Sequence, residues 1–155
     1  MLTELVVVER VFHYKFQVQG LKFRVMASIE KFEDIEAWKM ARELCINIYN
    51  NVLTKNHNNQ YALLNQIDRS SGSVMDNIAE GFERDGNKEF IQYLSIAKAS
   101  CGEVRSQLYR CFDRSLINED VHNRLSNDCR AISSKIGAFI NYLKKSELKG
   151  TKYKN

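Results

Sequence analysis

Long apolar runs are missing from this 155-residue sequence, and their absence argues against a location in a membrane. No run approaches the roughly 20 residues that a bilayer-spanning helix needs, so we expect no membrane association. The opening, MLTELVVVERVFHYKF, makes a poor signal peptide because its apolar run is only LVVV and glutamates flank it. We therefore expect a cytoplasmic protein with one main domain, since chains of this length bury a single core.

Catalytic signatures are also missing. The sequence has no P-loop, GxGxxG, HExxH or GxSxG motif, and only three histidines. Glu119 and His122 have the i, i+3 spacing of di-iron bundles, but the second such pair and further glutamates are absent. We interpret His122 as an exposed residue beside an acidic helix start. The sequence therefore predicts no enzymatic activity, catalytic residue, metal, cofactor or small-molecule substrate.

A helical ribonuclease is a rival interpretation of the same histidine. Such enzymes place an arginine four to six residues before a histidine, whereas Arg114 precedes His122 with seven residues between them. The spacing therefore does not match that of the helical ribonucleases, and the sequence favours a protein without enzymatic activity.

No cysteine pair has a redox or metal-ligand spacing. Each cysteine falls on the apolar stripe of a predicted helix, where a free thiol behaves as a small hydrophobe. We expect reduced, buried thiols at all four positions, Cys45, Cys101, Cys111 and Cys129.

A helical apolar repeat fills most of the chain. Apolar or small residues recur at alternating spacings of three and four, which is typical of helices packed in a bundle. Short polar connections favour antiparallel neighbours, so the predicted fold is all-α, an antiparallel up-down-up-down four-helix bundle. The helices are predicted over about 34–53 and 61–84, from the cap Asn87 with a stripe from Phe90 to Ser115, and from the cap Asn118 with a stripe from Leu125 to Leu143.

Several glycines and one alanine predict close contacts between helices. Gly72, Gly102 and Gly137 lie inside predicted helices, where each costs about 1 kcal/mol relative to alanine. Close packing against a neighbouring helix would explain all three. Ala79 and Gly81, in the segment NIAEG, are expected to allow close approach as well.

The first 25 residues follow a period of two instead, which predicts two strands joined at Gln19 and Gly20. A lone hairpin is marginal in water. The alternative is that translation starts at Met26 and the preceding residues are an unstructured upstream extension. The predicted organisation is an N-terminal extension over 1–27, a four-helix bundle over 28–147 and a basic tail over 148–155.

The amino-acid sequence of the second and third predicted helices resembles that of a known family. NQIDRSSGSVMDNIAEGFER, followed by KEFIQYLSIAKAS, resembles the signature of the four-helix-bundle proteins encoded in 23S ribosomal RNA intervening sequences. That family is related to the accessory variability proteins of diversity-generating retroelements. The resemblance runs from about Phe32 to about Leu143, although the loop TKNHNNQ lacks the family's usual proline. It implies assembly into a ring-like pentamer and a link to RNA or a nucleoprotein.

Exposed cations would carry such binding through contacts with phosphates. Lys98 and Arg105 are seven residues apart and share one helix face. In a monomer this is an ordinary solvated face, whereas in a ring the same charges repeat around a rim. The tail alone, with five lysines and one glutamate between residues 144 and 155, fits a solvated terminus. The predicted nucleic-acid-binding residues are Arg69, Arg84, Lys88, Lys98, Arg105, Lys144, Lys145 and Lys149.

Apolar residues off the main stripe of the third helix, Ile91, Tyr93 and Ile96, predict an oligomer interface. One helix of a four-helix monomer needs only one buried face, so a second apolar face suggests a partner. Scattered surface hydrophobes, or cover for the N-terminal segment, are the alternative. The predicted function is a non-enzymatic homo-oligomeric scaffold, a pentamer, that binds RNA or a nucleoprotein. A protein-binding bundle with no nucleic-acid role is the second hypothesis.

Overall fold

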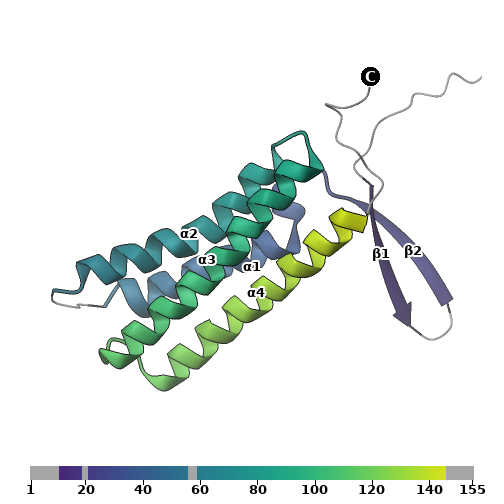
Figure 1. The fold of residues 1–155 in the computed structure, drawn as a ribbon. Coiled ribbons are helices and arrows are strands. Elements are labelled where there is room, and N and C mark those ends of the chain that lie inside the picture. Colours follow the sequence, from purple (N-terminus) through teal and green to yellow (C-terminus); the bar gives the residue numbers. More distant parts are fainter. Residues whose placement is uncertain (1–10, 19–20, 56–58, 146–155) are drawn as a thin grey trace, which may run out of the picture.

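The computed structural model describes residues 11–18, 21–55 and 59–145, and side chains from residue 29 onward within those ranges. Its four helices pack as an antiparallel bundle in which each helix contacts the next in the chain and α1 closes against α4 (Figure 1). This confirms the predicted all-α four-helix bundle. The helices are α1 (Glu36–Ile48), α2 (Tyr61–Phe82), α3 (Asn87–Asp113) and α4 (Glu119–Lys145).

The first predicted helix is divided into three pieces. A 3-10 turn, η1 (Phe32–Asp34), precedes α1, and a π-helical turn, η2 (Tyr49–Leu53), follows it. Arg124 of α4 donates to Asn51 Oδ1 within η2 at 2.9 Å. The wider turn is therefore tied to the neighbouring helix.

An antiparallel hairpin precedes the bundle and lies outside it (Figure 1). Strands β1 (Val11–Val18) and β2 (Leu21–Ser28) pair with Val18 opposite Leu21. The pairing matches the alternation in the sequence, while the predicted turn residues Gln19 and Gly20 fall outside the described residues. Translation from Met26 stays a prediction, and the basic tail over 148–155 also lies outside the described ranges.

The core follows the predicted stripe most closely in α3, where every stripe position from Phe90 to Cys111 is buried. Ser115 is the exception, because α3 has ended and the chain turns there with a φ of 57°. Most predicted stripe positions of the other helices are buried as well, but at a few the buried residue is the neighbour of the expected one, because both neighbours satisfy the alternating spacing. Leu44 is buried in place of Cys45, Leu63 in place of Leu64, and Ile140 more deeply than Phe139.

The cysteine prediction holds for three thiols and fails for Cys45, which is half-buried. Burial raises the pKa of Cys101 and of Cys129 to about 12, and that of Cys111 to about 11. Burial also raises the pKa of Cys45. All four thiols are free, as the sequence predicts.

Close helix contact occurs at Gly81, as predicted, and not at the three other helical glycines for which the sequence predicts it. A Cβ on Gly81 would lie 2.5 Å from Tyr93 Cβ and 2.9 Å from Phe90 Cδ2, so α2 and α3 meet there. A Cβ on Gly102 would find nothing within 4 Å, and at Gly72 and Gly137 the nearest atom is 3.8 Å away. The expectation for these three was wrong because they face solvent or the space between two helices.

The predicted helix starts are confirmed at one end and shifted at another. Asn118 caps α4, since its Oδ1 accepts from the backbone N–H of Val121 at 2.9 Å. At α3 the capping position belongs to Gly86, and Asn87 is the first helical residue.

Among residues 11–18, 21–55 and 59–145, no helix is both long and apolar enough to cross a membrane.

Candidate functional site

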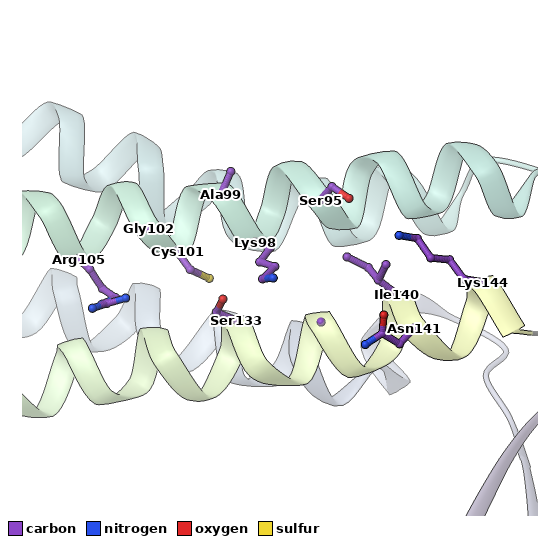
Figure 2. Close-up of a pocket in the computed structure, with 11 residues that line it drawn as sticks. Ser95, Lys98, Ala99, Cys101, Gly102, Arg105, Ser133, Ile140, Asn141 and Lys144 are labelled. Atoms are coloured by element: carbon purple, nitrogen blue, oxygen red, sulfur yellow. The ribbon is translucent and has the colours of Figure 1, made fainter.

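A groove of about 510 Å³ runs between α3 and α4 (Figure 2). On the α3 side its lining residues Ser95, Lys98, Gly102 and Arg105 recur at spacings of three, four and three, which places them along one flank of the helix. Gly102 and, on α4, Gly137 keep the space open, because neither has a side chain to fill it.

Positive charge dominates this groove. Lys98 and Arg105 point from α3 toward α4, and Lys144 points back from α4 (Figure 2). The described residues that line the groove include these three cations and no acid, and none of the three forms an ion pair within the described part of the chain. Arg105 Nε is buried and has no hydrogen-bond partner there. We call this the basic groove; it concentrates unpaired positive charge that attracts an anionic ligand.

His122 is buried, with 7% of its surface exposed, so the prediction of an exposed histidine was wrong. Two aromatic rings of α3 cover it: the centroid of Tyr109 lies 4.5 Å from that of His122, and the centroid of Phe112 lies 5.3 Å away. Its Nε2 lies 3.5 Å from Ser126 Oγ. Spacing along one helix could not reveal this cover, which comes from another helix.

Arg84 is held by its own neighbours at the end of α2. Its Nη2 donates to Glu80 Oε1 at 2.7 Å, and Tyr93 Oη donates to the same oxygen at 2.8 Å. The hydrogen bond from Arg84, and then that from Tyr93, lowers the pKa of the Glu80 carboxyl. The Arg84 guanidinium also lies 5.4 Å from the centroid of the Tyr93 ring. The structure thus places this predicted cation in a local cluster, apart from the basic groove.

Arg69 lies in a second groove, of about 570 Å³, between α2 and α3. Polar groups there pair with one another: Gln107 Nε2 donates to Ser70 Oγ at 2.9 Å, and Glu103 Oε2 lies 3.2 Å from that hydroxyl. Arg110, a cation that the sequence interpretation missed, donates to Gln66. The acid and the internal pairing make this groove a structural seam between the two helices.

The remaining predicted cations are dispersed. Lys88 is exposed at the start of α3, Lys145 is exposed at the end of α4, and Lys149 lies outside the described residues. Of the eight predicted residues, the structure therefore places Lys98, Arg105 and Lys144 along one groove.

The three predicted interface residues differ in their surroundings. Ile91 is partly buried against the core, and Tyr93 contacts Glu80 and Arg84 of α2. Ile96 is exposed, at 43%. The structure does not bring them together as one apolar face.

Metal ligation has no support in the part of the chain with described side chains. No group of three or more histidine, cysteine, aspartate or glutamate residues is arranged there to hold an ion.

The fold and the basic groove define a small antiparallel four-helix bundle with a cationic trough along one helix pair. The family model for the 23S rRNA-intervening sequence protein matches residues 33–138, and this chain belongs to that family. A similar solved structure is a protein of unknown function from the S23 ribosomal protein family of Bacteroides thetaiotaomicron. It is 24% identical, with 68% of this chain and 95% of that chain covered and a TM-score of 0.61, a likeness that shows the fold. No protein with a curated description matches the chain.

Proposed function

We propose that this protein is a non-enzymatic, cytoplasmic RNA-binding bundle that assembles as a homo-oligomer, a pentamer, and serves as a scaffold for RNA or a nucleoprotein. The observation that carries the proposal is the basic groove, along which Lys98, Arg105 and Lys144 are placed without an acid among the described lining residues. Cations that face one trough attract a phosphate backbone and release its counterions. Membership of a family named for ribosomal RNA intervening sequences agrees with this partner.

Assembly would serve the same function, because a ring would repeat the basic groove in every subunit and multiply weak contacts. The pentamer is what the family resemblance implies. Exposed apolar side chains available for subunit contact include Ile96 on α3 and Ile46 on α1. Light scattering behind a sizing column measures the mass directly; a mass of five chains supports the proposal, and a monomer at every concentration contradicts it.

Binding is tested by fluorescence anisotropy of a labelled 12-nucleotide single-stranded RNA with the full chain at graded salt. The proposal expects binding that weakens steeply as salt rises, since phosphate contacts release counterions. Absence of binding at low salt would contradict it. Affinity that does not change with salt would favour the protein-binding alternative.

The proposal assigns His122 no catalytic role. Its ring is buried beneath Tyr109 and Phe112, and its described polar neighbours are Asn123 and Ser126, neither of which is an acid or a base. RNA incubated with the protein should stay intact. Cleavage that disappears in His122→Ala would instead support the ribonuclease alternative.

A further inference from the structure

We propose that the basic groove binds single-stranded RNA, with phosphates held by Lys98, Arg105 and Lys144 and with bases stacked on Tyr109 and Phe112. This inference rests on the proposed RNA binding and adds the form of the RNA and the residues that hold it. The carrying observation is that the cationic flank of α3 continues directly into two exposed aromatic rings.

The continuity follows from the spacing. Lys98, Gly102, Arg105, Tyr109 and Phe112 recur at four, three, four and three, so they lie along one flank of α3, which we call the α3 row. At a rise of 1.5 Å per residue the α3 row is about 21 Å long. Contacts across to α4 agree, because Lys98 lies by Gly137 while Tyr109 and Phe112 lie against His122. The cations and the aromatics therefore belong to one continuous surface between α3 and α4.

The aromatic end is built to present rings to solvent. Tyr109 is 48% exposed and Phe112 is 39% exposed, although both pack on the buried His122 ring. Because the His122 ring supports both side chains, they have little conformational freedom to lose when a base stacks on them. Exposed aromatic side chains at the end of a cationic trough form a stacking platform.

This combination favours a single strand over a duplex. Proteins that bind single strands combine a cationic groove for the backbone with aromatic side chains on which unpaired bases stack. The bases of a duplex are stacked on each other inside the helix, and a double-stranded-RNA-binding domain recognises duplex RNA by its shape over about 16 base pairs. A row of about 21 Å offers contacts to only a few nucleotides.

The cationic end is tested by a triple variant, Lys98→Gln, Arg105→Gln and Lys144→Gln, with binding of a labelled 12-uridine RNA followed by anisotropy. We expect affinity at low salt to fall at least tenfold, and the slope of log affinity against log salt to fall by about 2 as three phosphate contacts disappear. The matched control removes the same charge from exposed positions elsewhere and should retain wild-type affinity. Its substitutions are Lys39→Gln, Arg42→Gln and Lys135→Gln.

The aromatic end is tested by removing bases from the ligand. The wild-type protein should bind the uridine RNA more tightly than an abasic RNA of equal length, by about fivefold or more, the effect of a stacked base. The double variant Tyr109→Leu and Phe112→Leu should lose this preference and keep its salt slope. Tyr49→Leu and Tyr61→Leu, at exposed tyrosines outside the α3 row, should keep both. Circular dichroism and light scattering confirm that each variant keeps its fold and mass.

The outcomes separate the inference from the function beneath it. If the wild-type protein binds no RNA, the proposed function fails. If it binds with a steep salt dependence that the groove triple variant does not alter, RNA binding stands and this inference is overturned. Equal affinity for a 12-base-pair duplex and for the single strand, or for uridine and abasic RNA, also overturns it.

Discussion

Replacing Gly81 by alanine should destabilise the bundle, although alanine is the better helix former. Gly81 is buried within α2, where an added Cβ would lie 2.5 Å from Tyr93 Cβ and 2.9 Å from Phe90 Cδ2. Tyr93 Cβ is attached directly to the backbone of α3, so the side chain cannot swing away. Relief of the clash therefore requires α2 and α3 to separate where they pack together.

The magnitude is a difference of two terms. Overpacking a closely packed site costs about 1–3 kcal/mol, and contact with a Cβ atom places Gly81→Ala near the upper value. The helix propensity of alanine returns about 1 kcal/mol. A net loss of about 2 kcal/mol lowers the midpoint of thermal unfolding by roughly 4–8 °C in a chain of this size.

Gly102→Ala is the matched control. It makes the same substitution inside α3, where the added Cβ has nothing within 4 Å. Here the propensity gain of about 1 kcal/mol stands alone, so the midpoint should rise by roughly 2–4 °C. Calorimetry at one protein concentration measures both variants. Equal stabilisation by the two alanines would refute the close contact at Gly81.

Three further predictions concern an exposed ion pair, the four thiols and the buried histidine. Arg84 and then Tyr93 lower the pKa of the Glu80 carboxyl, so these contacts stabilise the folded protein fully above the ordinary pKa of 4.5 and cease to do so as pH falls through the lowered pKa. Glu80→Gln should therefore reduce the midpoint of thermal unfolding at pH 7 and match the wild type near pH 2. At pH 8 a chromogenic disulfide reagent should modify Cys45 first, while the three buried thiols react only on unfolding; a count of two or more fast thiols would contradict this burial. His122→Ala removes a buried ring and should cost about 1–3 kcal/mol in chemical denaturation, and a change below 0.5 kcal/mol would contradict its packing role. The buried thiols are Cys101, Cys111 and Cys129.

The sequence predicts the fold well because the bundle depends on one periodic pattern. Alternating spacings of three and four identify each helix and its buried flank, but two adjacent apolar residues can both satisfy them. Leu44 and Cys45 form such a pair, and packing against other helices decides between them. The local pattern therefore fixes the helix and leaves its rotation uncertain by about one residue.

The candidate site could be predicted in part. The shared face of Lys98 and Arg105 follows from their spacing, whereas the approach of Lys144 depends on how α4 lies against α3. Tyr109 and Phe112 continue the same spacing and could have been found by extending it along the helix. The packing of these two rings on His122 could not be predicted from the sequence, because the contact joins residues of two helices.

Photo-cross-linking tests the central claim most directly. A single-stranded RNA containing 4-thiouridine, irradiated with the full chain and followed by trypsin digestion and mass spectrometry, reports which residues touch its bases. The account predicts adducts at Tyr109 and Phe112, in the tryptic peptides 106–110 and 111–114. Adducts confined to α1 or to the outer face of α2 would contradict it, as would the absence of any adduct under conditions in which the RNA is bound.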